Sequence, residues 1–203
     1  MPRTLGEQIE AVRAELSAAP EGLQAHVVRV AAEAADLARR WDIDPKRAEL
    51  AVWGHDLFRA VPEGEQVALA ERAGVRVRRA DRLAPVVLHG PSAAAILEER
   101  YEVTDREVLD AIAQHTLGAR QMPLLSKVLL IADKVETRKR ERDPAMRAIR
   151  KLAQRDLDLA LLCWADWKWV EERSHGWASH PAHWKARRAW VRAHHHEIRA
   201  GLR

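Results

Sequence analysis

The sequence has little of what disulfide-stabilised, membrane-spanning or secreted proteins require. Its 203 residues include one cysteine, Cys163, which excludes an internal disulfide and a cysteine-based zinc cluster. The best apolar run, LLSKVLLIA at 124–132, is interrupted by Lys127 and is too short to span a bilayer. The first ten residues, MPRTLGEQIE, are too polar for a secretory signal. We therefore expect a soluble, cytoplasmic protein with no membrane partner.

Signals for β-strands are nearly absent as well. Ala, Leu, Glu and Arg dominate the chain, and these residues favour helix. Internal repeats, low-complexity segments and long linkers are also lacking. Because 47% of the residues are apolar, a chain of this length can bury a core within one domain, with room for an appendage. We predict an all-α fold of nine or ten helices.

Capping and helix-breaking residues set the expected helix boundaries. Thr4 caps a first helix that runs to about Ala18. Asp44-Pro45 opens another helix, because aspartate caps and proline suits the first turn. Thr104 caps a helix through residue 115, with Glu107 completing a capping box. The remaining expected helices cover about 23–41, 65–74, 90–101, 122–140, 143–173 and the chain from 181 onward.

Six ionisable residues occupy positions where the helical pattern expects core-facing side chains. A lone histidine at such a position is more often a satisfied core residue than a ligand. An unpaired buried carboxylate, however, costs several kcal/mol and needs a cation or several donors. A metal centre satisfies the whole set at once. The six residues are His26, His55, Asp56, His89, His115 and Asp133.

The donor types restrict the metal. Neutral imidazole and carboxylate suit iron, manganese, cobalt or zinc, and thiolate ligands are absent from the set. Six ligands exceed what one tetrahedral zinc uses. A centre of two metal ions with a bridging carboxylate fits better.

The order H…HD…H…H…D of these residues resembles the ligand series of HD-domain phosphohydrolases with a binuclear metal site. The segments GHDLFR, LHGPSAA, AIAQHTLG and MPLLSKVLLIADKVE are similar to the bacterial YqeK-type family of symmetrical diadenosine-tetraphosphate hydrolases. The resemblance covers roughly residues 20–140. It implies an HD-domain helical bundle that cleaves diadenosine tetraphosphate symmetrically to two ADP.

The resemblance also implies roles for the ligands. One metal ion is held by His26, His55, Asp56 and Asp133. The second is held by His89 and His115, with Asp56 bridging the two. Iron is the first expectation, and manganese, cobalt and zinc are alternatives. A water shared by the metals attacks phosphorus, which makes Asp56 catalytic, and Asp133 is catalytic because it orients that water.

The chain departs from the family pattern at three places. Arg59 stands where a lysine usually follows the HD pair. The segment Glu136-Thr137-Arg138-Lys139 replaces Glu-Pro-x-Arg. The sequence after residue 140 does not look like the family.

A polyphosphate substrate also requires donors for its negative charges. A helix start at Gly90-Pro91-Ser92, next to His89, offers free N–H groups to an anion, although it can be an ordinary helix start. Gly118 either lets the backbone approach the ligand or is a plain helix C-cap. Each basic candidate is, on its own, more often a solvated charge. The substrate-binding candidates are Arg59, Gly90, Ser92, Gly118, Arg120, Lys127 and Arg138.

Residues 141–203 differ in composition from residues 1–140. They hold 13 Lys and Arg against 8 Asp and Glu, and six of the eight tryptophans. We predict a hydrolase domain over 1–140 and a Trp/Arg-rich helical extension over 141–203 packed on it. Alternating basic and aromatic residues can bind nucleic acid. We favour packing or a homodimer contact over that interpretation.

Two other functions remain open from the sequence. The same site can serve a nucleotidase or phosphodiesterase acting on a nucleoside mono- or triphosphate or a cyclic nucleotide. Alternatively, the chain is a nucleotide- or RNA-binding regulator that retains an HD core. Six inward-facing ligands argue against a regulator, because a binding module has no need of them.

Overall fold

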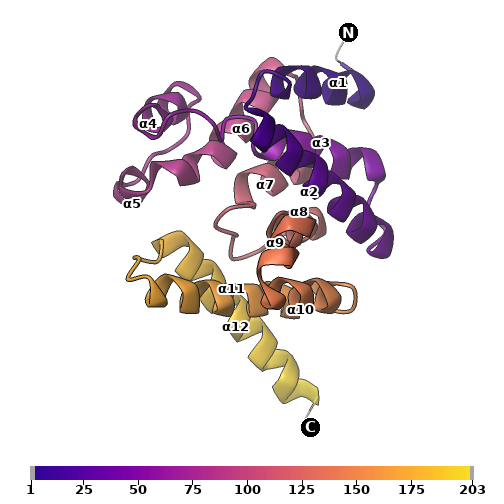
Figure 1. Ribbon diagram of the computed structural model, residues 1–203, viewed down its shortest axis with the longest axis vertical. Helices are drawn as coiled ribbons and strands as arrows, with labels where there is room; N and C mark the ends of the chain where they lie inside the picture. The colour runs from indigo at the N-terminus through magenta and orange to yellow at the C-terminus, as the bar shows by residue number, and fades with distance from the viewer. Residues whose placement is uncertain (1–2, 202–203) are drawn as a thin grey trace.

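The structure is a computed structural model that describes the backbone of residues 3–201 and the side chains of residues 3–195. In this part of the chain the all-α prediction is confirmed, since no β-strand occurs there (Figure 1). The helices are α1 Leu5–Leu16, α2 Glu21–Arg40, α3 Pro45–His55, α4 Glu63–Arg72, α5 Arg79–Leu83, the 3-10 helix η1 Pro85–Leu88, α6 His89–Arg100, α7 Arg106–Gln114, α8 Leu124–Val135, α9 Thr137–Arg142, α10 Pro144–Ala153, α11 Leu157–Ser174 and α12 Pro181–Gly201.

Local sequence signals account for several of the helix starts. The Thr4 hydroxyl accepts from the Glu7 N–H while the Glu7 carboxylate accepts from the Thr4 N–H, so α1 begins with a capping box. The Asp44 carboxylate accepts from the N–H groups of Lys46 and Arg47 at 2.8 and 3.1 Å, with Pro45 in the first turn of α3. Both predicted caps are confirmed.

The predicted cap of α7 is wrong. The N-cap is Asp105, whose carboxylate accepts from the N–H groups of Glu107 and Val108. The same carboxylate also accepts two bonds from the Arg47 guanidinium, at 2.6 and 2.9 Å. That pair ties the start of α7 to the start of α3, and it is a long-range contact that local sequence cannot reveal.

The nine helices that the sequence delimits become twelve α-helices within the described residues. The stretch 122–140 divides at Glu136, which takes an extended ψ of 159° and caps α9 through the Arg138 N–H. The stretch 143–173 divides between α10 and α11, where Asp156 caps α11. The short helix α5 was not expected at all. The flanking residues mostly favour helix, so the sequence did not predict the breaks between these helices.

Helix α8 is the centre of the core, and α2, α7, α10 and α11 pack around it. Nine of its residues are buried, so its apolar side chains are not confined to one face. Gly54 in α3 permits a close approach to α6 and α7. A Cβ there would lie 2.8 Å from a Leu97 methyl and 2.9 Å from an Ile112 methyl.

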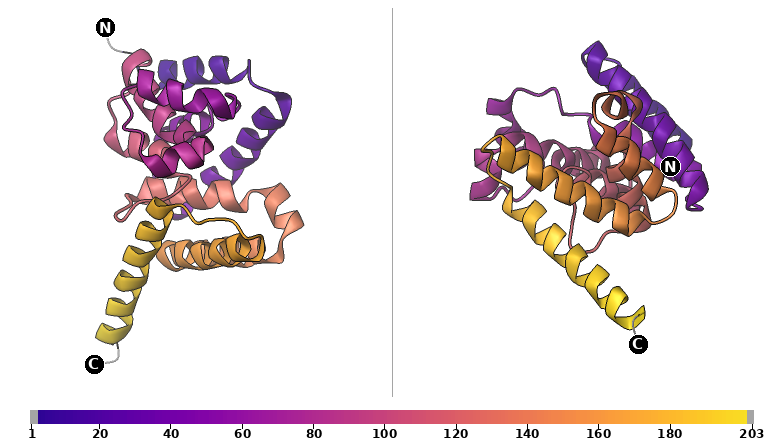
Figure 2. Two further views of the ribbon diagram at one scale, coloured as in Figure 1. Left: turned by 90° about the vertical axis from the view of Figure 1, so that its left-hand side faces the viewer. Right: turned by 60° about the horizontal axis from the view of Figure 1, so that its bottom comes forward.

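Residues after 140 form a lower layer of the molecule in which α10 and α11 lie against α8 (Figure 1). Met146, Ile149 and Trp164 join the same hydrophobic cluster as the core of the first 140 residues. Helix α12 packs on α11 at its start and then runs away from the rest of the molecule (Figure 2). Among the described helices, none combines the length and apolarity needed to cross a membrane.

Candidate metal centre and adjoining cavity

The carboxylate of Asp56, at the C-terminal end of α3, lies among four histidine rings. Its Oδ1 is 3.0 Å from Nε2 of His89 and 3.4 Å from Nε2 of His115. Its Oδ2 is 3.7 Å from Nε2 of both His26 and His55. Two groups with metal-ligand geometry result, and Asp56 belongs to both.

Helix ends orient three of these rings. His55 closes α3, His115 follows α7, and His89 follows η1. The last carbonyl groups of a helix have no intrahelical partner. In each case Nδ1 of the ring faces the carbonyl oxygen three residues earlier, so Nδ1 carries the proton and Nε2 keeps its lone pair for the centre. The carbonyl groups belong to Val52, Val86 and Ile112.

The resulting arrangement fits a bound cation. Nε2 of His55 is buried and has no hydrogen-bond partner among the described residues. Nε2 of His89 and Nε2 of His115 lie only 3.0 Å apart. If both Nδ1 atoms are protonated, two lone pairs face one another beside a carboxylate, which is unfavourable without a positive charge between them. The donor set therefore fits metal ions.

The ionisation states favour the same conclusion. Burial lowers the pKa of His115 to about 4, and it also lowers the pKa of His55. Burial by itself would raise the pKa of Asp56, but the charges and hydrogen bonds of the surrounding histidines outweigh it and hold that pKa well below its usual range. Near neutral pH, His55 and His115 are thus neutral imidazoles and Asp56 is an ionised carboxylate, which are the forms that bind metals.

Asp133, at the end of α8, lies on the other side of His26. Its Oδ1 is 3.1 Å from His26 Nε2 and accepts from the Lys139 ammonium at 2.8 Å. Its Oδ2 is ion-paired with Lys134. Burial opposes ionisation of Asp133, but Lys134 and Lys139 outweigh it and hold its pKa well below the usual range. Glu136 Oε1 lies 3.7 Å from His26 Nδ1, on the far side of the ring.

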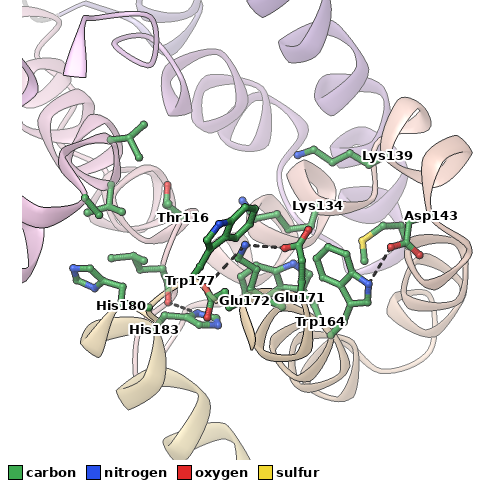
Figure 3. Close-up of a pocket in the computed structure, with 18 of the residues that line it drawn as sticks. Thr116, Lys134, Lys139, Asp143, Trp164, Glu171, Glu172, Trp177, His180 and His183 are labelled. Atoms are coloured by element: carbon green, nitrogen blue, oxygen red, sulfur yellow. Dashed lines mark hydrogen bonds and ion pairs between the residues drawn. The ribbon is translucent and has the colours of Figure 1, made fainter. Parts of the chain in front are cut away.

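A cavity of about 1320 Å³, whose lining is drawn in Figure 3, includes residues that contact the metal-ligand cluster. Thr116 lines it, and its hydroxyl oxygen lies 3.4 Å from His89 Nε2 and 3.1 Å from His115 Nε2. Lys134 and Lys139 line it as well, and both contact Asp133. The cavity thus borders the cluster at both ends of the ligand set, and it carries ammonium groups that suit an anion.

The sequence-based substrate candidates divide between the cavity and other places. Arg59 lines the cavity. Lys127 does not, because it pairs with Asp158 of α11 at 2.6 Å. Arg120 and Arg138 are exposed and lie outside the residues that line the cavity.

The three small candidates, Gly90, Ser92 and Gly118, lie in packed surroundings and do not form an open anion site. Gly90 is buried against α7, since a Cβ would lie 2.8 Å from the Ile112 carbonyl oxygen and 3.0 Å from the His115 ring. Ser92 is fully buried. No open helix start exists here, because α6 follows η1 directly. Gly118 has a φ of 68°, its N–H donates to the Gln114 carbonyl as in a helix C-cap, and the Trp190 ring covers it.

Several residues that line the cavity were not predicted from the sequence. Lys134 directly follows Asp133 in a largely apolar helix, and a lysine at that position was the available signal. Lys139 was seen only as part of a departure from the family pattern. The tryptophans after residue 140 were assigned to packing, which is correct for Trp164 at 3% exposure. Trp167 and Trp177 line the cavity.

Comparison with known families identifies the class. A family model described as "HD domain" matches residues 23–138, more than half of the chain. The chain belongs to the HD domain family. It is 35% identical over 137 residues to the symmetrical bis(5'-nucleosyl)-tetraphosphatase of Bacillus subtilis, covering 68% of this chain and 72% of that protein. It is 30% identical over 159 residues to the protein of the same name from Halalkalibacterium halodurans, covering 77% and 81% respectively.

A solved structure shares the fold. An HD superfamily hydrolase from Clostridium acetobutylicum, described as involved in NAD metabolism, superimposes with a TM-score of 0.85 at 25% identity. The match covers 91% of this chain and 97% of that one, so the likeness extends beyond residue 140. The sequence after residue 140 does not look like the family, yet its fold is shared with this HD superfamily hydrolase. The family match and these relatives make the chain an HD-domain phosphohydrolase.

Proposed function

We propose that this chain hydrolyses dinucleoside polyphosphates and cleaves diadenosine tetraphosphate symmetrically to two ADP. The observation that carries the proposal is the shared carboxylate of Asp56, which belongs to both metal-ligand groups. Relatives that bear the name of this activity are 30 to 37% identical to the chain. In the reaction, water adds to one central phosphorus, the bridging P–O bond breaks, and each half leaves as ADP.

The two ligand groups that share Asp56, together with the contact between Asp133 and His26, support the proposed ligand assignment. His26, His55, Asp56 and Asp133 would hold one ion, His89 and His115 would hold the other, and Asp56 would contribute to both. When bound, the two ions make a water nucleophilic near neutral pH and stabilise charge on the phosphoryl oxygens. Iron is the first expectation, with manganese, cobalt or zinc as alternatives, because the donors are imidazole and carboxylate.

The remaining steps belong to side chains along the cavity. Lys134, Lys139 and Arg59 would receive the phosphate oxygens, since each lines the cavity and carries a positive charge. The Thr116 hydroxyl can donate to a phosphoryl oxygen next to the histidine rings. Asp133 would orient the attacking water, because its carboxylate lies beside His26.

The test is hydrolysis of diadenosine tetraphosphate by protein purified without chelator. Products are separated by anion exchange, and metals are counted on the same sample. Two ADP per substrate with close to two metal ions per chain supports the proposal. AMP and ATP as products, or bound metal without turnover of this substrate, would redirect the search to other nucleotides.

A regulator that binds nucleotide or RNA without turnover would retain binding and show no hydrolysis at any metal loading. Binding of nucleic acid, a homodimer and a cytoplasmic location remain predictions from the sequence. The domain boundary at residue 140 also remains a prediction.

A further inference from the structure

Residues after 140 form more than half of the cavity lining. Twelve of the 21 lining residues come from this part of the chain. A volume of about 1320 Å³ exceeds the roughly 300–1,000 Å³ of most small-molecule pockets. A cavity of that size has room for more of a nucleotide than its phosphates. Another part of the ligand can therefore contact the lining residues after 140.

Three tryptophans line that wall, and the rings of two of them already contact a cation or another ring. Trp164 is 3% exposed, and the Lys134 ammonium lies 5.7 Å from its ring centroid. The Trp177 ring stacks on His175 with centroids 4.4 Å apart and an angle of 19° between the ring planes. The Lys168 ammonium lies 5.5 Å from the Trp177 ring. Neither ring is positioned to receive a further stacking partner without rearrangement.

Trp167 is different because its hydrogen bond is made by the edge of the indole, which leaves the ring faces without a stacking partner among the described residues. Its indole N–H donates to the Asp143 carboxylate at 3.0 Å, which fixes the orientation of the ring. Among the described residues, no aromatic ring or cation stacks on it. A half-buried, pre-oriented indole on a cavity wall is a suitable platform for a flat apolar group.

A short chain of contacts through α9 connects this indole to the metal-ligand cluster. Lys139 bonds Asp133, the Asp143 N–H donates to the Lys139 carbonyl at 3.0 Å, and Asp143 in turn holds Trp167. Lys139 and Asp143 are four residues apart, so the residue that contacts the cluster and the residue that anchors the indole lie about one helical turn apart along the backbone. The indole and the cluster are therefore linked through one short segment, and Lys139, Asp143 and Trp167 all line the cavity.

We propose that Trp167 is the platform on which one purine base of the substrate stacks, so that the C-terminal residues determine base preference. This rests on the proposed function, because it assumes that the cavity holds a nucleotide. A purine offers a larger stacking surface than a pyrimidine, and stacking tolerates different purines. ADP should therefore bind more tightly than UDP.

The experiment compares Trp167→Leu with Trp169→Leu as a matched control. Trp169 is on the same helix, two residues on and therefore on another face, and it is 40% exposed and does not line the cavity. Affinities for ADP, UDP and inorganic pyrophosphate are measured by calorimetry on metal-loaded protein. Loss of one stack predicts roughly tenfold weaker ADP binding in Trp167→Leu. Pyrophosphate binding stays the same, and Trp169→Leu changes neither.

Equal ADP affinity in Trp167→Leu and wild type, or an equal loss for pyrophosphate, would overturn the subsite. Failure of the proposed function is a separate result. In that case diadenosine tetraphosphate is not hydrolysed, yet ADP still binds in a Trp167-dependent way. If instead hydrolysis occurs and its KM is the same in Trp167→Leu, the function stands and the subsite is wrong.

A second measurement covers the case in which Trp167→Leu does not fold. Protein labelled with 5-fluorotryptophan gives one fluorine resonance per tryptophan, and Trp167→Phe assigns the resonance of Trp167. ADP should shift that resonance and pyrophosphate should leave it in place. A Trp167 resonance unmoved by saturating ADP would contradict the proposal.

Discussion

The indole ring of Trp190 lies directly over Gly118, so closely that a Cβ on the glycine would come within 2.6 Å of the ring. The Trp190 N–H also donates to the Ala119 carbonyl at 2.9 Å. These contacts attach α12 to the segment that directly follows His115 and Thr116. A residue near the C-terminus thus holds a loop that leads out of the metal-ligand cluster.

Substitution of Gly118 by alanine should destabilise the protein more than its backbone conformation alone predicts. The positive φ of 68° costs about 1 kcal/mol for a residue with a side chain, and the clash with Trp190 adds about 2 kcal/mol. Gly176→Ala is the matched control, since its φ is 69° but nothing lies within 4 Å of the added Cβ. Denaturant unfolding of both variants gives the comparison.

The excess loss in Gly118→Ala should disappear when the ring is removed as well. In the double variant Gly118→Ala with Trp190→Ala, the added methyl group meets no indole. An interaction energy near zero in this double-mutant cycle would refute the packing explanation.

Asp56→Ala should abolish both metal binding and hydrolysis. The carboxylate belongs to both ligand groups, so neither half of the centre is complete without it. The loss should exceed the roughly 10- to 100-fold that substitutions outside the ligand set cost. Metal analysis and turnover are measured beside Asp158→Ala, which removes a remote carboxylate paired with Lys127. Two metal ions retained in Asp56→Ala would exclude the bridging role.

Lys139→Met should weaken substrate binding while the metal content stays close to that of wild type. Lys139 lines the cavity and lies 2.8 Å from Asp133, so it reaches the place where phosphate oxygens would lie. One charge-assisted hydrogen bond is worth about 1.5–3 kcal/mol, which corresponds to a rise in KM of roughly tenfold or more. Lys151→Met, at an exposed position of α10, is the control. Equal KM values in the two variants would remove Lys139 from the substrate site.

Acid should destabilise protein from which a chelator has removed the metal ions, between about pH 6.5 and pH 4. Burial holds the pKa of His115 at about 4 in the folded state, below its ordinary value near 6.5. Between these values the unfolded chain binds a proton that the folded chain does not, so the free energy of unfolding falls as the pH falls. The loss from this residue is roughly 3 kcal/mol at most.

Urea unfolding of chelated protein at pH 7, 6 and 5 measures that loss. His115→Gln should flatten the dependence, whereas His175→Gln, which changes an exposed ring, should preserve it. Saturating metal should also oppose acid destabilisation down to the pH at which the ligands are protonated. A free energy of unfolding that is constant over this range would contradict the buried neutral state of His115.

Residue types in the sequence were sufficient to predict the class and the ligand candidates. His55 and Asp56 stand next to each other at the end of an apolar helix, and a buried carboxylate without a partner is costly. That cost depends only on the residue type and its place in the helical pattern, so it can be inferred without the tertiary structure. Caps such as Thr4 and Asp44 are equally local, and both were predicted correctly.

The substrate candidates were less predictable because their roles depend on distant residues. Lys127 resembles a phosphate ligand in the sequence, yet α11 brings Asp158 within 2.6 Å of it. Gly90 resembles part of an anion-binding helix start, yet it lies against the His115 ring. Charge and flexibility are visible in a sequence, but the direction in which a side chain points depends on the packing of its helix.

The sequence by itself determined the helical class, the histidine and aspartate donors and their chemical preference for metal ions, because propensity, burial cost and ligand type belong to individual residues. Only the tertiary structure decided that Asp56 faces both histidine pairs, that Lys134 and Lys139 meet at Asp133, and that Trp167 stands on a wall of the same cavity. Apart from the pairing of the neighbours Asp133 and Lys134 within α8, these relationships join residues from separate helices, so they arise from how the helices pack.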